Sequence, residues 1–382
     1  MEPYGSSNKR VDPDGLDEFS VVFTERSVNH MSALFCRAMR DISASLKIAY
    51  SADAVALIPG GGTYGMESVA RLFAADSNCI VLRNGWFSYR WSQIFDIGNI
   101  PKDYRVLKAE AMSEKEGAAF RPADLGEVLS QISDYRPKVL FAPHVETSSG
   151  ILLPDEYIAA IGEKMRAIDG HLVLDCVASG AQWIDMQRLG VDVLITAPQK
   201  GWSSTPCASA VMLSAKALET ASSRTSSSFV CDLNQWLGIM RKYEEGGYAY
   251  HATMPTDGLI QFRDAIFETQ EFGLEHAREK QCQLGKAVRT LLEGHGFKSV
   301  AAQGFQSPSV VVSYTDRPDI RNGKLFVKAG VQVAGGVPLM CDEPADFSTF
   351  RIGLFGLDKL GDVEGSVARL ERAVGDVLSA AI

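Results

Sequence analysis

Lys200 and Asp175 are the residues of this sequence whose types and positions best suit covalent chemistry. Lys200 lies just beyond the apolar run 191–196, and Asp175 ends the preceding apolar run, 171–174. A lysine amine forms an imine with an aldehyde, and a carboxylate keeps a pyridine nitrogen protonated so that the ring accepts electrons. Pyridoxal phosphate needs both groups, so the pair predicts that the chain binds this cofactor.

A glycine-rich run, Pro59-Gly60-Gly61-Gly62-Thr63, follows an earlier apolar stretch and opens a helix-like segment. Glycines let the backbone approach an anion closely, and a helix N-terminus offers free N–H groups with a favourable dipole. Gly61, Gly62 and Thr63 are therefore candidates for binding a phosphate group. The same composition also suits a flexible turn between a strand and a helix.

Two further motifs follow strand-like runs. Phe87, in the segment 84–91, suits stacking on a flat ring, although aromatic side chains at this spacing also build cores. The segment 142–150 contains Ser148 and neighbouring hydroxyls, which suit a phosphate or a ring oxygen, but which also suit a capped turn before a helix. We interpret His144 of this segment as a hydrogen-bonded core histidine rather than a catalytic one.

Short apolar runs alternate with helix-like stretches through most of the chain. Strands rich in Val, Leu and Ile that alternate with helices predict an α/β fold with a mostly parallel sheet covered on both faces. Ligands of such sheets gather at the carboxyl ends of the strands, where the motifs above lie. The expected strands are 54–58, 79–82, 105–107, 138–141, 172–174, 191–196 and 208–213, and the expected helices are 28–50, 65–75, 86–97, 121–135, 154–168 and 215–221.

The C-terminal part of the sequence has a different pattern. A long helical region, 255–294, precedes two strand-like runs at 309–314 and 350–354, and a final helix is expected at 358–380. We therefore predict a mobile N-terminal arm over 1–20, a large cofactor-binding domain over 21–270 and a small α+β domain over 271–382.

The order of glycine loop, aromatic residue, hydroxyl turn, aspartate and lysine resembles that of the class V aminotransferases. These enzymes belong to the fold-type-I group that depends on pyridoxal phosphate, and the resemblance extends over residues 50–360. It is strongest to the alanine–glyoxylate and serine–pyruvate aminotransferases, followed by 2-aminoethylphosphonate–pyruvate transaminase. The Asp175–Lys200 pair and the Gln199-Lys200 doublet are its most specific features.

The resemblance implies a role for each residue of the site. Lys200 would carry the cofactor as an imine, Asp175 would pair with its ring nitrogen, Phe87 and Val177 would enclose the ring, and Ser148 would donate a hydrogen bond. The residues that would hold the phosphate are Gly61, Gly62, Thr63, Gln199 and, from a second subunit, Tyr250 and Thr253. Arg351 would bind the substrate carboxylate, because a planar guanidinium matches that group.

The expected activity is a ping-pong transfer of an amino group between a small amino acid, alanine- or serine-like, and a small 2-oxo acid, glyoxylate- or pyruvate-like. The active site is expected at the interface of a homodimer. An alternative is carbon–sulfur lyase or desulfurase chemistry with Cys341 as persulfide acceptor, and another is a relative that binds the cofactor for regulation without turnover.

The composition of the chain argues against several classes of binding partner. The net charge of -9 and the isoelectric point near 5.3 argue against nucleic acid or an anionic membrane as a main partner. The seven cysteines and six histidines form no metal-binding spacing, so no metal is expected, and the scattered cysteines suit a reducing compartment. The sequence therefore predicts a cytoplasmic enzyme.

Overall fold

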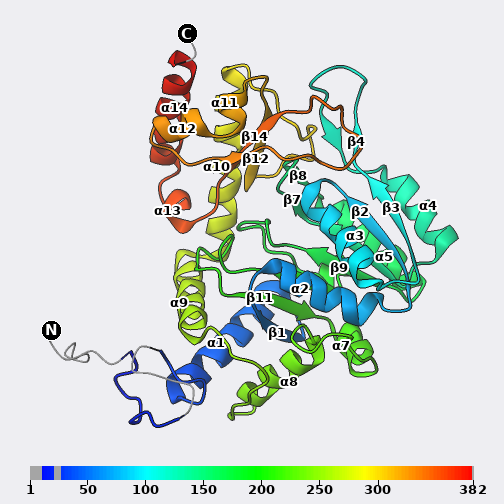
Figure 1. Cartoon of the computed structure of the whole chain (residues 1–382), viewed down its shortest axis with the longest axis vertical. Helices are drawn as coiled ribbons and strands as arrows, with labels where there is room; N and C mark the ends of the chain where they lie inside the picture. The colour runs from blue at the N-terminus through cyan, green and yellow to red at the C-terminus, as the bar shows by residue number, and fades with distance from the viewer. Residues whose placement is uncertain (1–10, 21–26, 381–382) are drawn as a thin grey trace.

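The computed structural model describes residues 11–20 and 27–380, and its centre is a mixed seven-stranded sheet (Figure 1). The strand order is β1-β11-β10-β9-β6-β2-β3, and β11 alone runs against the other six. The strands are β1 (Ala54–Pro59), β2 (Asn78–Arg83), β3 (Asp103–Lys108), β6 (Val139–Pro143), β9 (His171–Asp175), β10 (Val193–Thr196) and β11 (Ala208–Leu213). The prediction of a mostly parallel sheet is confirmed.

The central strands are buried along their whole length, as β6, β9 and β10 show. Such continuous apolar runs are typical of parallel strands that have helices on their faces. Helix α8 packs against β1, α2 against β11, α3 against β2 and α5 against β9. The helices of this part are α1 (Ala33–Tyr50), α2 (Gly62–Val69), α3 (Trp86–Gly98), α4 (Leu125–Tyr135), α5 (Asp155–Ala167), α6 (Met186–Leu189), α7 (Ala215–Ser222), α8 (Leu233–Glu244) and α9 (Thr256–Phe272), and a π-helical turn, Ala70–Ala74, continues α2.

Three helical boundaries differ from the prediction for local reasons. α1 begins at Ala33 because the Ser32 hydroxyl accepts from the N–H of Phe35 and caps the helix. α4 begins at Leu125, not at 121, because Asp124 caps it in the same way. The region 255–294 is helical, but Gly273 divides it, since its φ of 94° is a conformation that favours glycine.

The C-terminal part folds around a small antiparallel sheet of order β12-β14-β13. Its elements are α10 (Leu274–Gly294), β12 (Val310–Tyr314), α11 (Pro318–Arg321), α12 (Lys324–Lys328), β13 (Ala334–Gly335), β14 (Thr349–Gly353), α13 (Leu357–Leu360) and α14 (Val363–Ser379). One apolar core runs from Val28 to Ile266, and a second gathers residues of the C-terminal part with Ala181. The predicted domain boundary at 270 lies near this change of core, but the boundary itself stays a prediction.

Two short hairpins were absent from the sequence prediction: β4 (Glu110–Ala111) with β5 (Phe120–Arg121), and β7 (Val145–Glu146) with β8 (Ile151–Leu152). The first joins the two parts of the molecule. The N–H of Phe120 donates to the carbonyl of Val300 at 2.7 Å, and the Tyr314 hydroxyl donates to the carbonyl of Ala118 at 2.7 Å.

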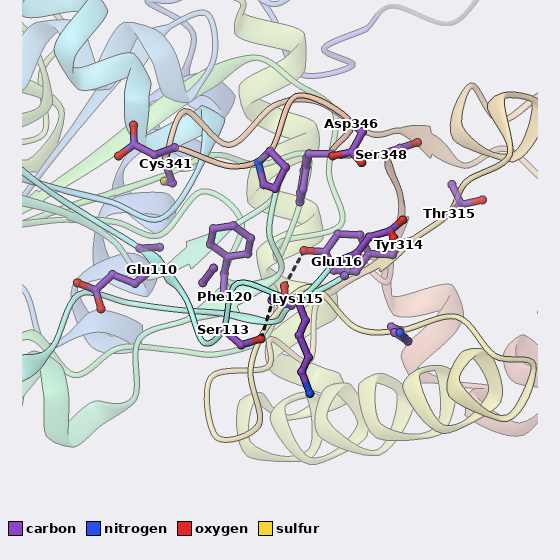
Figure 2. A pocket seen from close by; sticks show the side chains of 18 of the residues that line it. Glu110, Ser113, Lys115, Glu116, Phe120, Tyr314, Thr315, Cys341, Asp346 and Ser348 are labelled. Atoms are coloured by element: carbon purple, nitrogen blue, oxygen red, sulfur yellow. Dashed lines mark hydrogen bonds between the residues drawn. The ribbon is translucent and has the colours of Figure 1, made fainter.

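A cavity of about 1620 Å³ lies between this first hairpin and the C-terminal part. Figure 2 shows Glu110, Phe120 and Tyr314 around it. Lys200 and Arg351 are not among its lining residues, so this cavity is separate from the lysine and aspartate motif.

The predicted N-terminal arm falls partly outside the described residues, which omit 1–10 and 21–26. Among the residues that the structure describes, no helix combines the length and apolar character needed to cross a membrane.

Candidate active site

The turns that carry the sequence motifs meet at one edge of the central sheet. The strands β1, β2, β6, β9 and β10 run in the same direction, so their carboxyl ends lie along the same edge. Asp175, the last residue of β9, pairs across the sheet with Ile195 of β10 and Pro143 of β6. Lys200 follows β10 after a short turn. This edge is where ligands bind in sheets of this type.

Asp175 is a carboxylate in a place that penalises its charge. The side chain is only 8 % exposed, and it accepts one hydrogen bond, from the N–H of Val177 at 2.9 Å. Burial raises the pKa of Asp175 to about 6; the charge of Glu146 adds to the rise, and the charges of Arg90 and Lys200 oppose it. A cationic group beside Asp175 would therefore stabilise its ionised form.

Lys200 has a half-buried amine that forms no ion pair with any described residue. Its Nζ lies 4.9 Å from the ring centroid of Phe355, which belongs to the C-terminal part. Burial lowers the pKa of Lys200, the nearby charge of Arg351 lowers it further, and Asp175 opposes the change. A lysine with a lowered pKa is more often neutral, and a neutral amine is the nucleophilic form.

The glycine run forms the N-terminus of α2. A Cβ atom at Gly62 would lie 2.5 Å from Cγ2 of Val177, so the residue after Asp175-Cys176 packs directly on this loop. A Cβ atom at Gly61 would meet nothing within 4 Å, which leaves open space above the helix N-terminus. The Oγ1 of Thr63 accepts a hydrogen bond from Nη1 of Arg90 at 2.8 Å. The loop therefore borders an open region with backbone donors and a cation beside it.

Phe87 and Arg351 come together from different parts of the chain. Phe87 lies in the first turn of α3, and the guanidinium carbon of Arg351, on β14, lies 5.6 Å from its ring centroid. The Nε of Arg351 donates to the carbonyl of Gly335 at 2.9 Å. Burial lowers the pKa of Arg351, and the charge of Glu146 opposes that change. The fork of the guanidinium remains free of carboxylate partners among the described residues.

Glu146 is a site residue that the sequence prediction missed. It is fully buried, and its two carboxylate oxygens accept from the N–H groups of Phe87, Ser88 and Ser148 and from the hydroxyls of both serines, at 2.7–3.2 Å. An anion at this point also interacts favourably with the dipole of α3. Glu146 thus fixes the turn that carries Phe87. The signal in the sequence was an acidic residue between an apolar strand and a run of hydroxyls.

Ser148 is placed differently from its neighbour Thr147. The Ser148 hydroxyl is buried, donates to Glu146 at 2.8 Å and accepts from the N–H of Trp86 at 2.8 Å. Thr147 is half-buried, and its hydroxyl has no hydrogen bond to any described residue. The geometry therefore assigns Ser148 to the support of α3 and leaves the Thr147 hydroxyl available to a ligand.

His144 is buried, and its Nδ1 lies 2.7 Å from Oγ of Ser179. Burial lowers its pKa to about 4, so the ring is neutral near pH 7. The interpretation of His144 as a hydrogen-bonded core residue is confirmed.

The remaining residues predicted to hold the phosphate are Gln199, Tyr250 and Thr253. The side-chain amide oxygen of Gln199 is buried and has no partner among the described residues. Tyr250 is 57 % exposed, and its hydroxyl lies 3.2 Å from that of Thr253, which is also exposed. Within the described part of one chain, no hydrogen bond or ring contact joins these two residues to Lys200 or to the glycine loop.

The fold and this arrangement define an α/β enzyme with a half-buried lysine and a buried aspartate at the carboxyl edge of its sheet. The profile of the family "Aminotransferase class-V" matches residues 106–344, and the chain belongs to that family. Enzymes of this family use pyridoxal 5'-phosphate.

Similar proteins span nearly the whole chain. A 2-aminoethylphosphonate–pyruvate transaminase of Pseudomonas aeruginosa is 26 % identical over 91 % of this chain and 89 % of its own length. A protein of Synechococcus sp. named "Soluble hydrogenase, small subunit" is 24 % identical over 92 % of this chain and 88 % of its own. The crystal structure of an alanine–glyoxylate aminotransferase from Nostoc sp. superposes with a TM-score of 0.77 at 22 % identity, covering 91 % of this chain and 89 % of that one. The fold-type-I architecture is thereby confirmed.

The residues present fit the family's cofactor. Gly61 faces open space at a helix N-terminus, which would accommodate a phosphate. Gln199, next to Lys200 in the chain, has a buried polar atom with no partner among the described residues. Asp175 lacks the cationic partner that a protonated ring nitrogen would supply. The cofactor requires a lysine, a carboxylate and a loop that can bind an anion; Lys200, Asp175 and the glycine loop, which would meet these needs, all lie at one edge of the sheet.

Proposed function

We propose that this chain catalyses the reversible transfer of an amino group between a small amino acid, alanine- or serine-like, and a small 2-oxo acid, glyoxylate- or pyruvate-like. The observation that carries the proposal is the Lys200 amine, which is half-buried, free of ion pairs among the described residues and held beside Asp175 at the strand ends. The named activities of the relatives, which pair a small amino compound with pyruvate or glyoxylate, support this substrate class.

Pyridoxal 5'-phosphate, when bound, supplies the aldehyde that takes the amino group and a ring that accepts the electrons of the substrate. Asp175 would hold the ring nitrogen protonated, Phe87 and Val177 would enclose the ring, and the loop at Gly61 and Gly62 would hold the phosphate. Thr147, rather than Ser148, has the hydroxyl that remains available to the ring oxygen.

Lys200 would move the proton during turnover. Its Nζ is a basic group at the site, and burial with the charge of Arg351 lowers its pKa, which favours the neutral amine over the charged one. The ring of Phe355, whose centroid lies 4.9 Å from Nζ, covers one side of this amine. A proton taken from the substrate carbon can therefore be returned by the same atom rather than lost to solvent.

Arg351 would orient the substrate by its carboxylate. Its Nε is held by the carbonyl of Gly335, so the two terminal nitrogens are left to bind a planar anion. The neighbouring charge of Arg351 also depresses the pKa of Lys200, so binding of an anion there would raise that pKa toward its ordinary value.

We further propose that the active enzyme is a homodimer. Tyr250 and Thr253 lie exposed on the loop between α8 and α9, with their hydroxyls side by side. Two exposed hydroxyls in this arrangement suit a phosphate of the neighbouring subunit.

The test is a screen of amino acids with the cofactor-loaded protein. A donor must convert the bound cofactor from its aldehyde form to its amine form, seen as loss of the visible absorbance band, and a 2-oxo acid must restore that band. Alanine, serine and 2-aminoethylphosphonate are the first donors to try, and glyoxylate and pyruvate the first acceptors. A protein that acquires no visible band with added cofactor would contradict the proposal.

Desulfurase chemistry is the weaker alternative because of the position of Cys341. Its thiol is buried, donates to the carbonyl of Arg83 at 3.2 Å and has its pKa raised to about 12 by burial. Only a thiolate accepts sulfur readily, so Cys341 is unsuited to form a persulfide. Sulfide release from cysteine that is lost in Cys341→Ala would revive this alternative.

A further inference from the structure

We infer that Arg90 is an additional ligand of the cofactor phosphate, a role that rests on the proposed use of pyridoxal 5'-phosphate. Arg90 lies in α3 one turn beyond Phe87, and its guanidinium carbon is 5.3 Å from the Phe87 ring centroid. Its Nη1 donates to Oγ1 of Thr63 at 2.8 Å. The side chain therefore bridges the aromatic residue of the site and the glycine loop.

Arg90 is a cation without an anion. It is half-buried, and no carboxylate among the described residues lies within ion-pair distance of it. Other partly buried arginines have protein acceptors: Arg71 pairs with Glu67 at 2.6 Å and Arg263 with Asp41 at 3.5 Å. Arg224 and Arg289 lack a carboxylate among the described residues, but each donates to a backbone carbonyl, at 2.6 Å. Since a guanidinium is always charged, a half-buried one without a carboxylate is suited to a ligand anion.

The donors around Arg90 gather at the glycine loop. Because Oγ1 of Thr63 accepts its hydrogen bond from Arg90, the hydroxyl hydrogen of Thr63 is left to donate elsewhere. The free N–H groups at the start of α2 and the open space at Gly61 lie in the same loop. A guanidinium, a hydroxyl and helix N–H groups together match the several acceptor oxygens of a phosphate.

The attachment of the two arginines assigns them to different anions. Arg351 and Arg90 both lie against the ring of Phe87, at 5.6 and 5.3 Å from its centroid. Arg351 is held by Gly335 on the small sheet, whereas Arg90 is held by Thr63 on the glycine loop. The glycine loop is the proposed phosphate site, so Arg90 would bind the phosphate. Arg351 would then bind the substrate carboxylate.

The experiment compares pyridoxal 5'-phosphate with pyridoxal, which lacks the phosphate. The cofactor-free wild type, Arg90→Gln and Arg90→Lys are titrated with each compound, and binding is followed by quenching of tryptophan fluorescence. We expect Arg90→Gln to weaken the phosphate compound about 10- to 100-fold, as for loss of a charged hydrogen bond, and pyridoxal by less than about 2-fold. Arg90→Lys keeps the charge but not the fork, so its loss should be intermediate.

Arg105→Gln is the matched control, since Arg105 is an exposed arginine on β3, and it should leave both affinities unchanged. Melting temperatures of the cofactor-free variants check that each one folds. Equal losses for both compounds, or an unchanged affinity for the phosphate compound, overturn the inference. If Arg90→Gln binds pyridoxal 5'-phosphate as tightly as the wild type but has a raised KM for a substrate with a second anionic group, Arg90 binds the substrate and not the cofactor. A wild type that does not bind pyridoxal 5'-phosphate would instead overturn the proposed function itself.

Discussion

At the scale of single residues, the site is built from charges that lack their natural partners. Among the described residues, Lys200, Arg351 and Arg90 have no carboxylate within ion-pair distance, and Asp175 has no cation within that distance. Burial of such groups costs free energy unless they are paired. A ligand with a cationic ring nitrogen, an aldehyde and a phosphate, bound together with a carboxylate substrate, would relieve all four.

Lys200→Ala should abolish both turnover and the visible absorbance band of the cofactor-loaded protein. The reason is that Lys200 is the amine proposed to form the imine, so activity should fall by at least about 1000-fold. Absorbance and single-turnover kinetics measure the two effects. Lys286→Ala, at an exposed position of α10, should leave both unchanged. A visible band that survives in Lys200→Ala would show that another residue carries the cofactor.

Asp175→Asn should stabilise the cofactor-free protein at neutral pH but not in acid. Since burial raises the pKa of Asp175 from 3.8 to about 6, the folded state binds this proton more tightly than the unfolded state does. The stabilisation from this tighter proton binding is complete when the pH is below the pKa of Asp175 in the unfolded chain. It is lost as the pH rises through the pKa of Asp175 in the folded protein. The wild type therefore loses on the order of 3 kcal/mol of stability as the pH rises, whereas the asparagine variant does not, because its side chain cannot ionise.

Melting temperatures between about pH 4 and pH 7 measure this effect, and the advantage of the Asn variant should grow with pH. Added pyridoxal 5'-phosphate should reverse the order at neutral pH, because only the aspartate pairs with a protonated ring nitrogen. A difference that is constant with pH would contradict the expected titration of Asp175.

At the scale of elements, the N-terminus of α3 is the feature that positions Phe87. Gly85, with a φ of 159°, brings the backbone close to the turn at Glu146, where a Cβ atom would lie 2.0 Å from Oγ of Ser148. Glu146 then accepts from the first N–H groups of the helix. One buried carboxylate therefore serves as the helix cap and fixes the aromatic side of the site.

Glu146→Gln should lower the free energy of unfolding by about 2–3 kcal/mol. The amide has one acceptor oxygen in place of two, so its NH₂ group would face the N–H donors that the carboxylate now satisfies. Urea unfolding of the cofactor-free protein measures the change. Glu163→Gln, at an exposed position of α5, is the control and should differ from wild type by less than about 0.5 kcal/mol. Equal stability of the two variants would show that the buried carboxylate does not support α3.

Elements were predictable where the local pattern is strong. The seven strands of the central sheet agree with their apolar runs within a few residues. For the strands inside the sheet, the reason is that a strand covered on both faces is apolar along its whole length. α8 was not predicted, and neither were the two-residue strands of the hairpins β4–β5 and β7–β8. Such short strands exist only because another segment lies beside them, as Phe120 lies beside Val300, and no local pattern records that.

At the scale of the whole molecule, the site lies between the two parts of the chain. Arg351 and Phe355 reach it from the C-terminal part, and the N–H of Leu357 donates to the Ser203 hydroxyl just beyond Lys200, at 2.9 Å. The remaining open side is where Tyr250 and Thr253 of a second subunit would complete the phosphate site. The proposed dimer thus makes each site depend on both chains.

Mixing two inactive variants tests this dependence. Lys200→Ala and a Tyr250→Ala/Thr253→Ala double variant are unfolded, mixed in equal amounts and refolded together. If the hydroxyls act across the interface, each hybrid dimer has one intact site, and the mixture should recover about a quarter of the wild-type activity. Each variant refolded alone is the control. Recovery no greater than the sum of the two controls would place Tyr250 and Thr253 in the same site as the Lys200 of their own chain.

The sequence by itself determined the architecture and the central pair, Lys200 and Asp175. Both follow from local features: apolar runs make strands, and the residues that end those strands must meet at the carboxyl edge of a parallel sheet. Only the tertiary structure decided which hydroxyl is available, since Ser148 is occupied by Glu146 and Trp86 while Thr147 is not. It also brought Arg90 to Thr63 and Arg351 to Phe87. Those contacts join residues far apart in the chain, and they depend on packing and hydrogen bonding that no single segment encodes.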